Sequence, residues 1–150
     1  MSHAPSVRYI TADELAKLLK SKSTKDINDV AVVDVRDDDF VGGNIVAAMN
    51  VPSGTFHANV QDLVKRLENG ELHPRGQAWL PKVVFHCALS QQRGPKAART
   101  YAEARELCLT EKQREKAQQI YVLRDGFSGF QSKFRDDPEL VEKFNKMYHD

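Results

Sequence analysis

The chain has 150 residues, which fits a single domain spanning residues 1–150 around one hydrophobic core. Its 22 basic and 21 acidic residues leave a net charge of +1, so no global field favours nucleic acid or an anionic membrane as a partner. No apolar stretch approaches the roughly 18 residues of a membrane span, and the amino terminus lacks the apolar core of a signal peptide. We therefore expect a soluble cytoplasmic protein, with the nucleus as the other compartment open to it.

The first third of the chain predicts a strand, a helix and a second strand. Residues 7–10 favour a short strand, and Thr11 and Glu14 form a capping box that opens a helix ending near Lys20. Residues 30–35 are an almost unbroken apolar run, which is typical of a strand covered on both faces.

Charged residues lie at the end of this second strand. Asp34 and Arg36 could face a ligand crevice, but we favour a structural role in which they anchor neighbouring loops. The acidic run 37–39 is typical of a solvated loop, although one of its carboxyl groups could serve as a proton donor. Gly42 and Gly43 then predict a turn with unusual backbone angles.

The middle of the chain predicts two helices on either side of a buried strand. Residues 49–51 form a short strand, and an apolar stripe predicts an amphipathic helix that ends near Gly70. Residues 82–86 form the central strand, and small side chains in 94–107 predict a helix that packs closely against the sheet.

Two polar segments, 21–28 and 71–81, are expected to be loops. The second contains the only tryptophan, Trp79, which we expect to cover the core rather than to contact a substrate. No motif in it indicates what the protein recognises.

The last third predicts a helix, a strand and another helix. Thr110 and Gln113 form a second capping box, whose charged helix runs toward Gln118 before a strand over 120–123. Residues 125–127 are expected to form a turn.

The carboxyl-terminal segment predicts a final helix. Asp137 and Pro138 suit the cap and the first helical residue. The stripe expected to face the core consists of Leu140, Val141, Phe144, Met147 and Tyr148. Strands thus alternate with helices, which predicts an α/β fold with a central, mostly parallel sheet, helices on both faces and a site at the carboxyl ends of the strands.

The most informative stretch follows the strand over 82–86. It begins at Cys87, and Arg93 comes after five intervening residues, where the next helix begins. If this loop curls, its backbone N–H groups and those of the helix N-terminus converge on one point, which can bind an oxyanion. The residues expected to form this cradle are Ala88, Leu89, Ser90, Gln91, Gln92 and Arg93.

The same environment suits nucleophilic catalysis. A helix N-terminus and a nearby arginine stabilise thiolate over thiol, so Cys87 is the candidate nucleophile. Arg93 carries a planar fork of donors that can hold two oxygens and the charge that grows during transfer. The alternative is an inert buried cysteine, but the strand, loop and helix around Cys87 favour catalysis. For His86, a local hydrogen bond is expected rather than a catalytic role.

The second cysteine, Cys108, is a poor partner for Cys87 in a redox cycle. The two lie at opposite ends of the expected helix, about 20 Å apart by helical rise, whereas a disulfide needs Cα atoms within about 7 Å. Cys108 is expected to be a packing residue.

The string HCALSQQRGP resembles the active-site loop of a known family, the rhodanese-fold M-phase inducer phosphatases and eukaryotic arsenate reductases. Residues 32–36, 40–45 and 122–127 are similar to further motifs of that family, so the resemblance covers most of the chain. It implies a rhodanese-like fold. Two departures stand out: Asn44 replaces a usual histidine, and Gln92 replaces the glutamate of the M-phase inducers.

Two enzyme functions follow. The first is hydrolysis of aryl phosphates or of phosphotyrosine in a phosphorylated protein, through a phosphocysteine. Because Gln92 cannot act as a general acid, aryl phosphates are favoured unless one of four carboxyl groups reaches the leaving group. These four are Asp37, Asp38, Asp39 and Asp125. The second function is reduction of arsenate, a small oxyanion, for which the resemblance implies glutathione and a glutaredoxin as the external reductant.

Two other functions are less favoured. Sulfur transfer through a Cys87 persulfide does not suit the loop, since the loops of the resembling sulfurtransferases are one residue shorter. A non-catalytic module that docks a phosphorylated partner would need only the backbone and Arg93. We expect no bound cofactor and no metal, because the two cysteines and five histidines show no ligand spacing.

Overall fold

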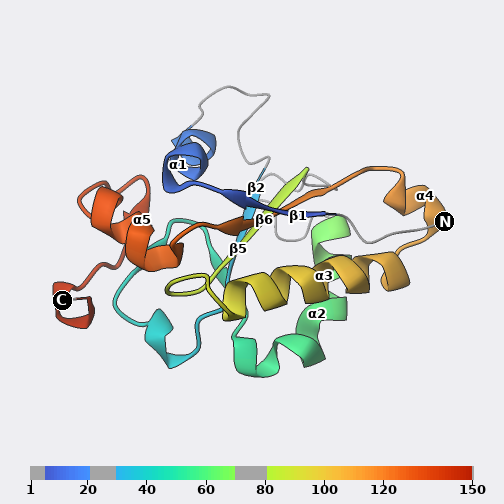
Figure 1. Ribbon diagram of the computed structural model, residues 1–150, viewed down its shortest axis with the longest axis horizontal. Coiled ribbons are helices and arrows are strands. Elements are labelled where there is room, and N and C mark those ends of the chain that lie inside the picture. Colours follow the sequence, from blue (N-terminus) through green and yellow to red (C-terminus); the bar gives the residue numbers. More distant parts are fainter. Residues whose placement is uncertain (1–5, 21–29, 70–80, 150) are drawn as a thin grey trace.

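The computed structural model describes residues 6–20, 30–69 and 81–149. Its centre is a five-stranded parallel sheet with the order β1-β6-β5-β2-β4 (Figure 1). In that order the strands are β1 (Val7–Ile10), β6 (Gln119–Leu123), β5 (Lys82–His86), β2 (Val30–Asp34) and β4 (Met49–Asn50). The predicted parallel sheet is confirmed, and the strand that leads into Cys87 is its middle strand. The loop predicted over 21–28, and the part of the second loop that contains Trp79, lie outside the described residues.

Helices cover both faces of the sheet, as predicted (Figure 1). The elements α1 (Ala12–Lys20) and α5 (Gly126–Phe134) pack on one face, and α2 (Ser53–Glu68) and α3 (Arg93–Cys108) pack on the other. Along β5, Val83 and Phe85 join the core under α2 and α3, whereas Val84 joins the core under α1 and α5. This alternation explains why the strand sequence is apolar throughout. In the described ranges, no helix is long and apolar enough to span a membrane.

The predicted start of α1 is confirmed by both bonds of its capping box. Thr11 N donates to Glu14 Oε1 at 3.0 Å, and Glu14 N donates to Thr11 Oγ1 at 3.1 Å. The predicted glycine turn is also present, with φ values of 103° at Gly42 and 134° at Gly43.

The second capping box is confirmed, but its helix is shorter than predicted. The helix α4 spans only Glu111–Arg114, and none of its residues is buried. A helix of four residues with no buried side chain lacks the tertiary packing that would stabilise further turns. The chain instead turns so that buried Gln118 accepts a hydrogen bond from the Tyr101 hydroxyl at 2.7 Å.

The segment expected to be only a turn at 125–127 begins a helix. Asp125 adopts a left-handed conformation, and α5 starts at Gly126. Two glycines lower the intrinsic helix propensity of this segment, which hides it in a local pattern. Burial of Phe127 and Phe130 against the sheet stabilises the helix in the fold.

The predicted final helix after Pro138 is wrong. The structure instead has a two-residue strand, β7 (Val141–Glu142), paired antiparallel with β3 (Asn44–Ile45), followed by a short 3-10 helix, η2 (Lys146–Tyr148). Leu140 is buried, whereas Met147 is 87% exposed, so the stripe does not share one face. The partner strand lies almost a hundred residues earlier, out of reach of any local periodicity.

This correction can be tested by two alanine substitutions. Leu140→Ala is expected to lower the free energy of unfolding by about 2–5 kcal/mol, because it opens a cavity in the core under α1 and α5. Met147→Ala is expected to change it by no more than about 0.5 kcal/mol. Urea unfolding of both variants is the measurement, and similar losses would instead support the predicted helix.

Candidate active site

A buried ion pair lies at the carboxyl edge of the sheet. Arg36 donates from Nη2 to Asp34 Oδ2 at 2.7 Å and from Nε to Oδ1 at 3.0 Å, and both side chains are essentially inaccessible. Arg36 also donates to Gly43 O at 2.8 Å and to Asp39 O at 3.2 Å, and its guanidinium lies over the Phe127 ring. The structural role favoured for this pair is therefore the one observed.

His86 lies beside Asp34, because the two residues are register partners at the ends of β5 and β2. Its Nδ1 and Cys87 O are 3.0 Å apart, which is the local hydrogen bond expected for this residue. Its Nε2 has no hydrogen-bond partner and lies 3.7 Å from Asp34 Oδ2. Full burial lowers the pKa of His86, so the ring is held neutral.

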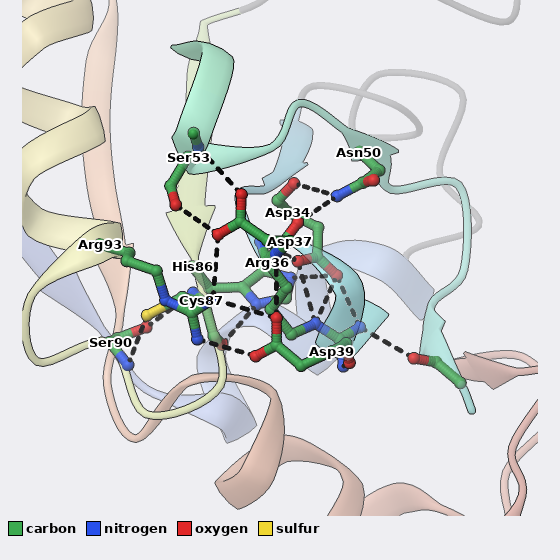
Figure 2. Close-up of polar contacts among 12 residues, drawn as sticks. Asp34, Arg36, Asp37, Asp39, Asn50, Ser53, His86, Cys87, Ser90 and Arg93 are labelled. Carbon is green, nitrogen blue, oxygen red and sulfur yellow. Dashed lines mark hydrogen bonds and ion pairs between the residues drawn. The ribbon is translucent and has the colours of Figure 1, made fainter. Parts of the chain in front are cut away.

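The loop after β5 folds back on the cysteine sulfur. Ser90 N donates to Cys87 Sγ at 3.2 Å, and Ser90 Oγ accepts from Cys87 N at 3.4 Å. Ser90 has a φ of 57°, a left-handed conformation that turns its N–H toward the sulfur (Figure 2). At least one donor of the predicted cradle thus points at the predicted nucleophile.

The first turn of α5 holds the other side of this loop. Phe127 N donates to Cys87 O, and Ser128 N donates to Ala88 O, both at 2.9 Å. This approach requires a glycine at 126, where φ is 57° and a Cβ would lie 2.5 Å from both carbonyl oxygens. The helix that the sequence concealed is therefore what fixes the carbonyl groups of the cysteine loop.

Arg93, the first residue of α3, reaches toward the acidic segment that follows β2 (Figure 2). Its Nη2 donates to Asp39 Oδ2 at 2.8 Å and its Nη1 to Asp39 Oδ1 at 3.0 Å, with Asp37 Oδ2 at 3.3 Å from Nη1. Hydrogen bonds from Arg93 lower the pKa of Asp39, and the same contacts raise the pKa of Arg93. Arg93 therefore lies in a charge network that sequence reasoning missed.

Asp37 is held by the start of α2 as well as by Arg93. Its Oδ2 accepts from Ser53 Oγ at 2.5 Å and its Oδ1 from Gly54 N at 2.9 Å, and these two bonds are the main reason that its pKa is lowered. The run expected to be merely solvated is thus partly structural: Asp38 has an exposed side chain but begins a short 3-10 helix, η1 (Asp38–Phe40). The sequence did contain a signal for this contact with Arg93, because the segments that follow β2 and β5, two adjacent parallel strands, meet at the same edge of the sheet.

The remaining predicted cradle residues, Ala88, Leu89, Gln91 and Gln92, lie in the same loop, and their contact with an oxyanion stays a prediction. A pocket of about 270 Å³ opens beside the loop between α2 and α3, with Arg93, Lys96 and His57 in its lining. Among the described residues, no group of three or more His, Cys, Asp or Glu side chains could hold a metal ion.

Cys108 and Asn44, the two other residues that the sequence analysis singled out, both make structural contacts. Cys108, at the far end of α3 from Cys87, is partly buried and packs against the core, as expected. Asn44, which departs from the family pattern, donates from Nδ2 to Ile45 O and to Glu142 Oε1, both at 2.9 Å. It therefore links β3 to β7.

Known proteins resemble this chain over most of its length. The family model described as Rhodanese-like domain matches residues 11–133. Dual specificity phosphatase ibp1 of Schizosaccharomyces pombe is 30% identical over 148 residues, covering 91% of this chain and 97% of that protein. Among solved structures, the yeast rhodanese-family protein tyrosine phosphatase Ygr203w has a TM-score of 0.79 at 28% identity and covers 100% of both chains. The As-Sb reductase from Leishmania major has a TM-score of 0.71 at 30% identity, covering 91% of this chain and 85% of its own.

The buried ion pair gives a testable stability difference. Arg36→Met is expected to lower the free energy of unfolding by about 3–5 kcal/mol, because it leaves the Asp34 carboxylate buried without its partner. The control Arg66→Met breaks an exposed pair with Asp62 on α2 and is expected to cost at most about 1 kcal/mol. Urea unfolding measures both, and equal losses would contradict a special role for Arg36.

The neutral, buried His86 predicts a pH dependence of stability. Its pKa is lowered in the native state, so below about pH 6.5 the unfolded chain binds a proton that the native state disfavours. The free energy of unfolding should therefore fall with acidification, by up to about 1.4 kcal/mol per pH unit. Urea unfolding at several pH values gives the free energy of unfolding as a function of pH. This free energy should fall less steeply with acidification in His86→Gln than in His57→Gln, a control at an exposed position on α2. Equal slopes would be the contrary result.

Proposed function

We propose that this chain, which belongs to the rhodanese-like domain family, is a cysteine-dependent phosphatase acting on aryl phosphates and on phosphotyrosine in proteins. The observation that carries this proposal is the 3.2 Å contact between Ser90 N and Cys87 Sγ. A loop that folds its N–H groups onto a cysteine at a helix N-terminus suits both a thiolate and an oxyanion. The phosphatases among the similar proteins support the same reaction class.

In the proposed reaction, the Cys87 thiolate attacks phosphorus as the bond to the leaving oxygen breaks, which forms a phosphocysteine. The N–H groups of the loop and the guanidinium of Arg93 hold the equatorial oxygens, where negative charge grows. Water then attacks phosphorus, the P–S bond breaks, and phosphate leaves with the thiolate restored.

The carboxyl groups near the site favour aryl esters as substrates. Asp37 and Asp39 carry lowered pKa values and pair with Arg93, so they are carboxylates rather than proton donors in this arrangement. Asp125 lines a pocket with Thr11 and Lys133 beside α1, and Cys87 does not contribute to that pocket. Asp38, the fourth candidate, has an exposed side chain. If none of the four protonates the leaving oxygen, a phenolate is a far better leaving group than a serine alkoxide.

Arsenate reduction is the second candidate, favoured by the likeness to the Leishmania As-Sb reductase and by the lack of an acid at Gln92. Arsenate has nearly the shape and charge of phosphate, so the same cradle and thiolate would serve. Because Cys108 packs at the far end of α3, the electrons would come from outside the chain, and the family resemblance implies glutathione and a glutaredoxin as their source.

Turnover of an aryl phosphate by pure, reduced protein tests the phosphatase proposal. Cys87→Ser should fall to the uncatalysed rate, because a hydroxyl is not ionised at neutral pH. Cys108→Ser should keep wild-type activity and is the matched control. Arsenate with glutathione and glutaredoxin is assayed in parallel. If the wild type reduces arsenate and leaves aryl phosphate intact, the second candidate replaces the first.

A further inference from the structure

The contact between Arg93 and the acidic segment leaves part of the guanidinium uncommitted. The two Nη atoms donate to the two oxygens of Asp39, and Nη1 also donates to Asp37. A guanidinium has five N–H donors, so these bonds leave Nε–H and the second hydrogen of Nη2. Within the described ranges, Nε makes no hydrogen bond. One edge is therefore held by carboxylate while a second, two-donor edge stays free.

Arg93 lies near the cysteine as well as the acidic segment, since the charge of Cys87 is one of the influences that raise the pKa of Arg93. Figure 2 shows the Arg93 head group between Cys87 on one side and Asp37 and Asp39 on the other. In this view the two carboxylates and the sulfur lie on different sides of the head group. An oxyanion seated over Cys87 would meet the remaining edge, which can bind two oxygens at once.

The carboxylate that holds Arg93 is itself fixed by bonds that do not involve Arg93. Asp39 Oδ1 accepts from Asp37 N at 2.9 Å, and Asp39 O accepts from the buried Arg36 at 3.2 Å. Asp37 is tied to the start of α2 through Ser53 and Gly54. Such a preorganised anchor differs from an isolated surface ion pair, which contributes little.

We propose that Asp39 is a positioning residue, which holds one edge of the Arg93 guanidinium so that the Nε and Nη2 edge faces the oxyanion over Cys87. This deepens the proposed function and rests on it. Asp39 does not touch the substrate. Its effect comes from limiting the rotamers of a long side chain before the anion arrives, which lowers the entropy lost on binding and in the transition state.

A double-mutant cycle isolates this effect from that of the Asp39 charge. Asp39→Asn removes a negative charge, which by itself favours an anion, whether or not Arg93 is present. Arg93→Lys keeps a positive charge but has no second edge to orient. In the protein that keeps Arg93, Asp39→Asn should lower kcat/KM for an aryl phosphate about 5- to 20-fold relative to its effect in the Arg93→Lys variant. Asp136→Asn, at an exposed position just after α5, should change it less than about twofold, and Asp39→Glu should retain most of the activity.

Binding of inorganic phosphate to the Cys87→Ser protein gives a second measurement, which does not need turnover. Nuclear magnetic resonance should show the Arg93 Nε–H signal shift on phosphate addition, with weaker binding in Cys87→Ser, Asp39→Asn than in Cys87→Ser, Asp136→Asn. Equal or tighter binding with Asp39→Asn, or no coupling in the cycle, would overturn the proposal. If Cys87→Ser binds phosphate but the wild type does not hydrolyse the aryl phosphate, the phosphatase function alone is rejected. If Cys87→Ser does not bind phosphate and the wild type does not hydrolyse the aryl phosphate, the oxyanion site is rejected, and the positioning role with it.

Discussion

The buried ion pair between Asp34 and Arg36 is the interaction on which the carboxyl edge of the sheet depends. Two charges removed from water are tolerated only when their hydrogen bonds are satisfied. Arg36 meets this condition through Asp34, the backbone oxygens of Asp39 and Gly43, and the face of Phe127. One side chain thus joins β2, the acidic segment, the glycine turn and α5. Of these parts, α5 binds the carbonyl oxygens of the cysteine loop, and the acidic segment binds Arg93 at its end.

The cysteine loop is held from two directions, and this sets which of its groups remain for a ligand. The N-terminus of α5 occupies the carbonyl oxygens of Cys87 and Ala88, while Ser90 turns its N–H onto the sulfur. The two carbonyl groups that α5 binds are directed away from the sulfur side, as the proposed oxyanion cradle requires, and the Ser90 N–H is the donor of the loop that points at Cys87. The left-handed backbone at Ser90 and the glycine at 126 are the local cost of that arrangement.

In the proposed function, the acidic segment (Asp37, Asp38 and Asp39) links the orientation of Arg93 to the choice of substrate. Carboxylates that accept strong hydrogen bonds are stabilised as anions: bonds from Ser53 and Gly54 lower the pKa of Asp37, and the contact with Arg93 lowers that of Asp39, so neither is suited to donate a proton. A site built in this way favours leaving groups that need no proton, as in an aryl phosphate, or a substrate such as arsenate. The two proposed reactions therefore share one physical basis, and they differ in what resolves the intermediate on Cys87.

The sequence by itself determined the elements that local chemistry controls. Apolar runs located β2 and β5, three-residue spacings located both capping boxes, and the spacing of Cys87 and Arg93 located the loop between a strand and a helix. Tertiary structure alone decided the pairing of β3 with β7, the helix over Gly126–Phe134 and the contact between Arg93 and Asp39. Periodicity and caps act over a few residues, whereas these contacts join segments that meet only after the parallel strands have aligned their carboxyl ends.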